Sequence, residues 1–268
     1  MKQIKTDTIK VTPTMCLAWL EKNEDNRGLH QNHIATLART MARKDWEVNG
    51  ESLKIDTAGN ILDGQHRMWA CIEAKTPFKT MVTTGLPREV FDTIDTGIIR
   101  TAIDILTVKK ETNVSTIVAA LKHIGRYYSG TMMSMYKFTN REIEELLDQH
   151  PDIRGFASHV QQTRNQVRWC AGSIIATTWY LASRINKAQA DVFFESFVEG
   201  SNLEVDSAIL VLRNKLIDIH INPLQRLSAT HKIQLIIVTW NLWRKGKSVK
   251  HFRLSTLNTK SVDFPSFK

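Results

Sequence analysis

The stretch Ile61-Leu-Asp-Gly-Gln-His-Arg-Met-Trp-Ala70 decides the fold of the first third of this chain. Its two leading apolar residues fit a short strand, and Asp63-Gly64 is a typical turn pair. The residues from Gln65 to Lys75 then place their apolar side chains on one side, as an amphipathic helix does. We therefore expect a strand that runs directly into a helix, with Gly64 at the junction.

A junction of this kind suits a phosphate group. The first turn of a helix presents backbone N–H groups without helical partners and carries a partial positive charge. Gly64 lets the backbone approach a ligand closely, and Arg67 adds a two-pronged donor. The sequence therefore predicts a phosphate site formed by Gly64, Gln65, His66 and Arg67.

Three residues near this junction are candidates for catalysis. Asp63 is placed to hold Mg²⁺ or to cap the helix, and His66 to donate to a phosphate or to move a proton. Glu51, which enters the preceding strand, is a candidate general base. In the alternative interpretation Asp63 only caps the helix, His66 and Arg67 lie on the surface, and Glu51 is a solvated acid. We expect Arg67 to be on the solvent side, so that its loss leaves the fold intact.

Periodic patterns extend the prediction in both directions. A helix is predicted over residues 31 to 45, strands over 53 to 56 and 61 to 62, and a further strand over 78 to 84. After about residue 105 the patterns indicate helices only: 113 to 128, 140 to 150, 152 to 169, 172 to 185, 187 to 199, 206 to 219 and 229 to 245. The expected fold class is α+β, with a small mixed-sheet domain over residues 1 to 105 and an all-helical domain with a short C-terminal tail over 106 to 268.

The first domain resembles the ParB/sulfiredoxin superfamily. Gly64, Arg67 and Ala70 match its Gly-x-x-Arg-x-x-Ala motif at the same strand-to-helix junction, and the resemblance covers about residues 5 to 105. It implies a sulfiredoxin-like fold that binds a nucleoside triphosphate, ATP or CTP, with Mg²⁺. The form Asp63-Gly-Gln-His-Arg67 also resembles ParB-like proteins of phages, restriction systems and DNA modification systems.

The resemblance implies a second binding element. ParB proteins carry a later Asn-x-x-Arg element that contributes to triphosphate binding, and Asp95-Thr-Gly-Ile-Ile-Arg100 lies at a comparable position. Asp95, Thr96, Gly97 and Arg100 are therefore expected to close over the nucleotide. The alternative is a plain turn that leads into a helix at Ala102.

Some residues of the motif differ from those of known members of the superfamily, and these differences restrict the activities that the resemblance implies. Sulfiredoxin needs a cysteine where Gln65 stands, which excludes peroxiredoxin repair. Partition ParB proteins have Glu at the position of His66. Free-serine kinases of the superfamily carry His-His-Arg, close to Gln65-His66-Arg67, which keeps NTP hydrolysis and phosphoryl transfer open.

The net charge of +9 over 268 residues lies entirely in the second domain. Residues 1 to 105 hold 14 basic and 14 acidic side chains, whereas residues 240 to 268 alone hold seven basic residues and one acidic residue. Basic residues interleaved with aromatic ones suit a nucleic acid. The sequence therefore predicts DNA binding by Arg244, Lys245, Lys247, Lys250 and Arg253. The alternatives are a solvated basic tail, and core packing for Trp240 and Trp243.

Other classes of protein are excluded by composition. No apolar run approaches the roughly 20 residues that cross a bilayer, and the opening MKQIKTDTIK lacks the apolar core of a signal peptide. Cys16, Cys71 and Cys170 have no metal-ligand spacing. We expect a cytoplasmic protein without a structural zinc.

Together these patterns predict a ParB-like protein, encoded by a phage or mobile element, that binds an NTP while acting at DNA and that hydrolyses the NTP or transfers its phosphate. One alternative is a non-catalytic DNA-binding regulator in which the nucleotide pocket is a switch or a relic. The other is a Mg²⁺-dependent nuclease that uses Asp63 and Asp95, which ranks last because the sequence has no dense carboxylate cluster. A homodimer remains open as the assembly.

Overall fold

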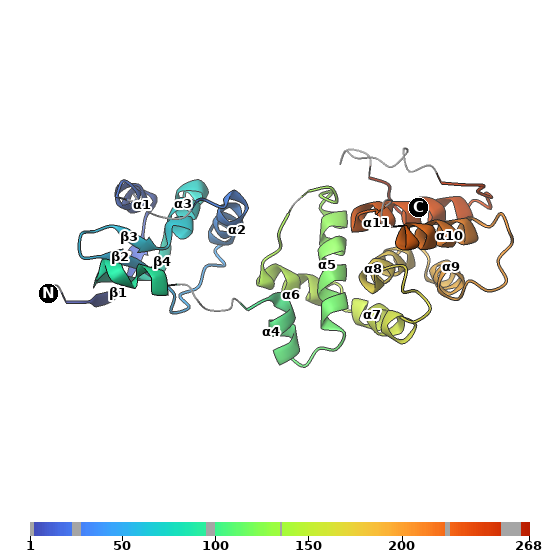
Figure 1. The fold of residues 1–268 in the computed structure, drawn as a ribbon, viewed down its shortest axis with the longest axis horizontal. Coiled ribbons are helices and arrows are strands. Elements are labelled where there is room, and N and C mark those ends of the chain that lie inside the picture. Colours follow the sequence, from blue (N-terminus) through green and yellow to red (C-terminus); the bar gives the residue numbers. More distant parts are fainter. Residues whose placement is uncertain (1–2, 23–27, 95–99, 135, 223–225, 253–263) are drawn as a thin grey trace. The chain divides into compact units, whose positions relative to one another are not determined.

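The protein divides into two compact units, Met1–Ile99 and Arg100–Lys268 (Figure 1). The structure is a computed structural model that describes residues 3–22, 28–94, 100–134, 136–222, 226–252 and 264–268. The boundary falls earlier than the expected one after residue 105. Helix α4 (Ala102–Val108) belongs to the second unit, since it packs against α5 (Val114–Tyr128) and α6 (Asn140–Gln149).

A four-stranded mixed sheet forms the base of the first unit. Its strands are β1 (Lys5–Val11), β2 (Ser52–Asp56), β3 (Ile61–Asp63) and β4 (Phe78–Leu86), in the order β1-β4-β2-β3. β4 pairs antiparallel with β1 and parallel with β2, and β2 pairs antiparallel with β3. The predicted strands are confirmed, and β3 is an edge strand that delivers the chain to the junction.

Three helices cover one face of this sheet: α1 (Pro13–Leu20), α2 (Gln31–Ala42) and α3 (Gln65–Ala74) (Figure 1). Side chains alternate across a strand, so Phe78 and Val82 face the helices and are buried, whereas Lys79 faces away and is exposed. Leu53 of β2, Met68 of α3 and further apolar residues of the three helices complete this core. A 3₁₀ helix, η1 (Arg88–Thr93), follows β4.

Strand β1 and helix α1 were not among the predicted elements. β1 is an edge strand whose residues are mostly exposed, so it lacks the apolar alternation that marks a strand. The start of α1 does carry a signal, because Thr12 caps the helix through a hydrogen bond from the Met15 amide (3.3 Å) and Pro13 occupies its first turn.

The second unit is helical throughout its described part. It contains α4, α5, α6, α7 (Ile153–Gln162), α8 (Gly172–Ser183), α9 (Lys187–Glu199), α10 (Ala208–Ile221) and α11 (Ala229–Trp243). The helix predicted over residues 152 to 169 is wrong in its second half, because α7 ends at Gln162. The chain beyond it forms turns in which the Trp169 indole N–H donates to the Gln166 carbonyl (3.2 Å).

Helix α8 is the centre of the second core. Every residue from Ile174 to Ala182 is buried. Its two central threonines satisfy their hydroxyl groups within the helix, where Thr177 donates to the Ser173 carbonyl (2.7 Å) and Thr178 to the Ile174 carbonyl (2.8 Å). Around it pack aromatic residues of α9 and α11, among them Phe193, Phe197 and Trp240.

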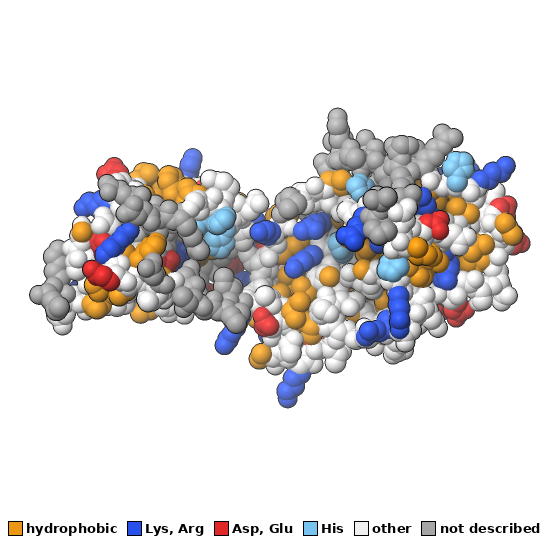
Figure 2. Space-filling model, viewed as in Figure 1, with side chains coloured by type: hydrophobic (Ala, Val, Ile, Leu, Met, Phe, Trp, Pro, Cys, Tyr) orange, Lys and Arg blue, Asp and Glu red, His pale blue; other side chains and the backbone are white. Residues whose placement is uncertain are grey.

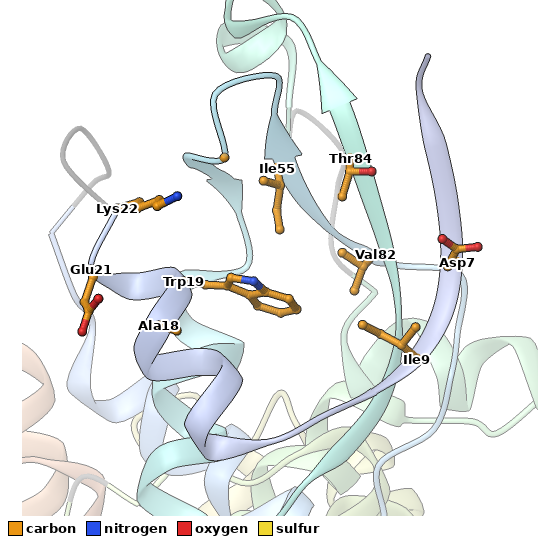
Figure 3. Close-up of a pocket in the computed structure, with 10 residues that line it drawn as sticks. Asp7, Ile9, Ala18, Trp19, Glu21, Lys22, Ile55, Val82 and Thr84 are labelled. Atoms are coloured by element: carbon orange, nitrogen blue, oxygen red, sulfur yellow. The ribbon is translucent and has the colours of Figure 1, made fainter. Parts of the chain in front are cut away.

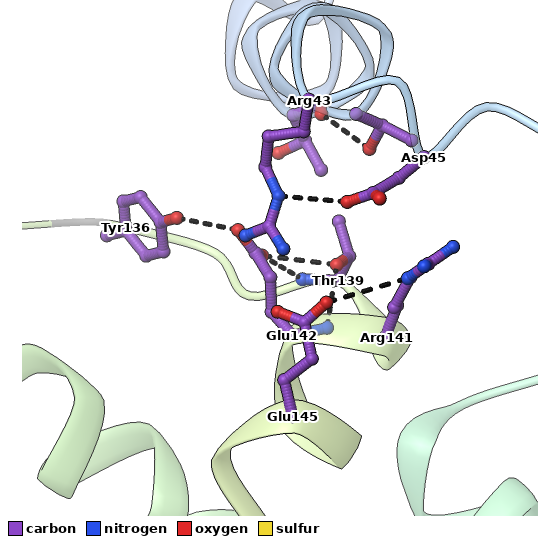
Figure 4. Close-up of polar contacts among 9 residues, drawn as sticks. Arg43, Asp45, Tyr136, Thr139, Arg141, Glu142 and Glu145 are labelled. Carbon is purple, nitrogen blue, oxygen red and sulfur yellow. Dashed lines mark hydrogen bonds and ion pairs between the residues drawn. The ribbon is translucent and has the colours of Figure 1, made fainter. Parts of the chain in front are cut away.

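The start of α6 confirms the capping box that its sequence indicates. The Glu142 amide donates to the Thr139 hydroxyl (3.2 Å), and the Thr139 amide donates back to the Glu142 carboxylate (2.8 Å). The Tyr136 hydroxyl donates to the other carboxylate oxygen (2.9 Å; Figure 4). These contacts fix where α6 begins.

Within the described part of the chain, none of the helices has the length and apolar character needed to cross a membrane. Cys16, Cys71 and Cys170 are buried free thiols.

Helix α5 holds a histidine whose burial predicts a pH dependence of stability. Burial, together with the nearby cations Arg126 and Lys122, lowers the pKa of His123 to about 4, and its Nδ1 atom has no partner among the described residues. As pH falls below about 6.5, unfolded chains take up a proton at this histidine that the folded protein does not. Its contribution to stability is therefore lost between about pH 6.5 and pH 4.

We expect His123→Gln to flatten this part of the pH profile by about 2 kcal/mol between pH 6.5 and 4.5. The free energy of unfolding is measured by urea denaturation at several pH values. His220→Gln, which changes an exposed histidine of α10, is the control and should leave the profile unchanged. Parallel profiles for wild type and His123→Gln would contradict the assignment.

Candidate functional site

Gly64 forms the sharp connection between β3 and α3. Its φ of 105° lies in the left-handed region that favours glycine. A Cβ atom at this position would lie 2.3 Å from Leu53 Cδ2, so a side chain is excluded by contact as well as by conformation. The sequence prediction of a glycine junction is confirmed.

Arg67 binds the protein itself. Its Nη2 donates to Asp63 Oδ2 (2.9 Å) and to the Ser52 carbonyl (2.9 Å), and Lys54 Nζ contacts the same Asp63 oxygen (2.9 Å). The side chains of Arg67 and Asp63 are only 14% and 16% exposed. Arg67 therefore joins β2, β3 and α3, and the prediction that it lies on the solvent side is wrong.

His66 joins two helix starts. It is buried, and its Nε2 accepts a hydrogen bond from the backbone N–H of His30 (3.1 Å), so its ring proton sits on Nδ1. The His30 ring stacks on the His66 ring (centroids 5.7 Å apart), and His33 lies against it at 5.4 Å. The alternative in which His66 and Arg67 are surface residues is wrong.

The N-termini of α2 and α3 therefore meet at His66. The N-cap residues are His30 and Gly64, and neither helix start has a side-chain cap or an acidic residue in its first turn. Asp63 does not cap α3, because its carboxylate is bound to Arg67 and Lys54. Two positive helix ends thus lie together without an acidic side chain in either first turn.

The other predicted residues of this site are distributed differently. Gln65 is buried in the first turn of α3. Glu51 has an exposed side chain, and its carbonyl accepts a hydrogen bond from the Thr80 hydroxyl (3.2 Å). Asp95, Thr96 and Gly97 lie outside the described residues. Arg100 belongs to the second unit, where its carbonyl accepts from Asn140 Nδ2 (3.0 Å).

The described residues contain no group of three or more His, Cys, Asp or Glu side chains arranged to hold a metal ion. At Asp63 the Oδ2 atom already faces two cations, Lys54 and Arg67. Binding of Mg²⁺ there requires either the other carboxylate oxygen or displacement of one of these side chains.

The predicted DNA-binding segment divides into two kinds of residue. Arg244 is bound within the fold: its Nε donates to Gln189 Oε1 (2.7 Å), another nitrogen donates to the Lys268 carbonyl, and the guanidinium lies over the Trp240 ring. Lys245, Lys247 and Lys250 are exposed, and their ammonium groups have no ion pair or hydrogen bond among the described residues. Arg253 lies outside the described residues.

The tryptophans of this segment are core residues. Trp240 is fully buried, and the partly buried Trp243 packs edge-on against Phe193 (centroids 5.4 Å apart). The core packing that the sequence offered for Trp240 is therefore confirmed, and the exposed residues of the segment are its cations. On the visible face of the second unit, Lys and Arg side chains cover more surface than Asp and Glu (Figure 2).

Sequence patterns missed His30 and His33. They belong to the site only because α2 and α3 pack together, and no motif at the start of α2 marks them.

Comparisons of the chain with protein-family models, with curated proteins and with solved structures find no match.

The contacts of Arg67 predict a structural role. Arg67→Ala leaves Asp63 with a single cation partner in a poorly exposed place and removes the bond to the Ser52 carbonyl. We expect a loss of about 2–3 kcal/mol in the free energy of unfolding, measured by urea denaturation. Lys79→Ala, which removes an exposed cation of β4, should change it by less than about 0.5 kcal/mol. Equal stabilities for Arg67→Ala and Lys79→Ala would show that the Asp63 contacts do not hold the junction.

Proposed function

We propose that the first unit binds the phosphates of a nucleoside triphosphate where the N-termini of α2 and α3 meet. The observation that carries this proposal is the pairing of two helix starts at His66, both without an acidic residue in the first turn. Helix N-termini favour anions through their N–H groups and their partial positive charge. The resemblance of Gly64, Arg67 and Ala70 to the ParB/sulfiredoxin motif supports a nucleotide as the anion.

The residues of the junction either approach the phosphates or hold the residues that do. Gly64 permits close approach, and Gln65 and His66 place the first turn of α3. Arg67 acts as a positioning residue, because its guanidinium holds Asp63 and the Ser52 carbonyl. Lys54 and Arg67 together carry one more positive charge than Asp63 neutralises, which adds to the attraction for a phosphate.

Turnover is the second part of the proposal. Hydrolysis or phosphoryl transfer needs a base and a group that neutralises charge on the transferred phosphate. Glu51 is the candidate base, since its side chain is exposed next to Ser52. His66 is less suited to proton transfer, because its Nε2 lone pair already accepts the His30 N–H. The nucleotide-binding role that the resemblance implies for Asp95, Thr96, Gly97 and Arg100 remains a prediction.

We also propose that the second unit binds DNA. All of the excess positive charge lies there, and Lys245, Lys247 and Lys250 are exposed cations without protein partners in the described chain. The same observation favours the second candidate function, a non-catalytic DNA-binding regulator with a nucleotide switch. No observation favours the nuclease, because the described residues hold no cluster of carboxylates for metal ions.

The anion site is tested with a charge placed at the start of α2. Gln31 is exposed at the first position of this helix, so Gln31→Glu should stabilise the helix by about 0.3–1 kcal/mol. The same charge repels phosphates, and we expect NTP affinity to fall about five- to tenfold. A thermal-shift screen of ATP, CTP, GTP and UTP with and without Mg²⁺ identifies the nucleotide, and calorimetry measures its affinity.

Gln3→Glu is the matched control, since it makes the same change beside β1, at the opposite edge of the sheet. It should leave NTP affinity unchanged. The proposal fails if no NTP stabilises the protein, or if Gln3→Glu weakens binding as much as Gln31→Glu does.

DNA binding is tested by its salt dependence. Replacing Lys245, Lys247 and Lys250 by Gln removes at most three phosphate contacts, which should reduce the slope of log affinity against log salt by up to about 2.7. Arg244 is kept because it holds the C-terminal residues. Fluorescence anisotropy with single- and double-stranded DNA gives the slopes. Replacing Lys109, Lys110 and Lys187 by Gln removes the same charge just after α4 and at the start of α9. An equal change of slope in that variant would contradict DNA binding by Lys245, Lys247 and Lys250.

A further inference from the structure

A cavity of about 620 Å³ lies between α1 and the sheet of the first unit (Figure 3). Ile9, Ile55 and Val82 from three strands form its apolar floor, and the Trp19 indole projects into it from α1. Its volume is within the range of about 300–1,000 Å³ that is typical of small-molecule sites. None of its lining residues belongs to the junction at Gly64 to Arg67, so it is a separate site.

The cavity exists because α1 is shorter than the strand it covers. The eight residues of α1 span about 12 Å, whereas the seven residues of β1 span about 23 Å. Only Thr12 separates the two elements, so α1 returns along the sheet from the Val11 end and stops before the end that carries Asp7. Beyond the end of α1, Asp7 and Thr84 are exposed and Ile9 is half-buried, whereas Ile55 and Val82 at the bottom of the cavity are buried.

Lys22 is the cation at the mouth of the cavity. Asp7 is paired with Lys5 (2.9 Å), and the Glu21 side chain is directed away from the cavity (Figure 3). Lys22 extends toward the turn between β2 and β3, with its Nζ 3.5 Å from the position that a Cβ on Gly59 would take. Its ammonium has no ion pair or hydrogen bond among the described residues.

We propose that this cavity binds a small aromatic carboxylate. A flat ring fits between the Trp19 indole and the branched side chains of Ile55 and Val82, where aromatic packing adds to the burial of apolar surface. The carboxylate then meets the Lys22 ammonium at the mouth. An ammonium substituent on the same ring would be repelled by Lys22.

The charge preference is tested with two probes that share one ring. Indole-3-acetate is anionic and tryptamine is cationic, and isothermal titration of the full chain compares them. We expect indole-3-acetate to bind up to about fivefold more tightly, as one exposed ion pair provides. Lys22→Gln should bring the two affinities together. The proposal is overturned if neither probe binds, if tryptamine binds more tightly, or if Lys22→Gln leaves the ratio unchanged.

A variant with a larger side chain in the cavity tests whether the ligand binds there. Thr84 is exposed and lines the cavity, so Thr84→Phe should abolish binding of indole-3-acetate without overpacking the core. Thr8→Phe places the same side chain on the helix-free face of the sheet and should leave binding unchanged. Trp19→Ala, which removes the wall, should weaken both probes.

Binding of indole-3-acetate in the cavity does not depend on the proposed nucleotide site. Thr84→Phe should keep the thermal stabilisation by an NTP, which also shows that the variant is folded. Binding of indole-3-acetate that survives in Thr84→Phe would place the ligand elsewhere and overturn the proposal.

Discussion

The ion pair between Arg67 and Asp63 is the interaction on which the first unit depends. Asp63 ends β3, Arg67 lies in the first turn of α3, and the same guanidinium nitrogen reaches the Ser52 carbonyl at the start of β2. This set of bonds determines the angle at which α3 leaves the sheet, and Gly64 provides the backbone conformation that the angle requires. Because α3 is fixed, His66 is held where its Nε2 accepts the His30 N–H, and this hydrogen bond positions the start of α2. The candidate phosphate site is therefore a consequence of how the edge of the sheet is closed.

This arrangement gives the junction its electrostatic character. An acid in the first turn of a helix would stabilise that helix, yet α2 and α3 have none, and the nearby Asp63 is directed to two cations of the protein. Neither first turn therefore carries an acid that would repel the anion we propose, and the cost of burying Arg67 is offset by its bonds to the carboxylate and the carbonyl. An acid at either helix start would give a more stable helix and a weaker anion site.

Much of the fold could be predicted from local patterns, because these patterns act within a few residues. The glycine at position 64, the capping box of Thr139 and Glu142, and the end of α9 before Gly200 are all such cases, and the structure confirms them. The partners of Arg67 and His66 could not be predicted, since they depend on the pairing of β2 with β3 and on the packing of α2 against α3. For the same reason the motif suggested a solvent-facing Arg67. The core packing expected of Trp240 from its spacing is confirmed, but its partner Phe193 on α9 could not be predicted, because that contact depends on how the helices pack.

Helix α1 is shorter than stability alone would favour. One or two more turns would cover Ile9 and the neighbouring floor, and burying apolar surface stabilises by about 25 cal/mol per Å². The chain instead ends α1 at Leu20, so that Trp19 lies at the edge of the cavity and Lys22 lies at its mouth. Places where a fold departs from what stability alone favours are where function is expected. The cavity lies beside α1, whereas the site that we propose for phosphate is formed by α2 and α3, so the two proposals concern separate positions of the first unit.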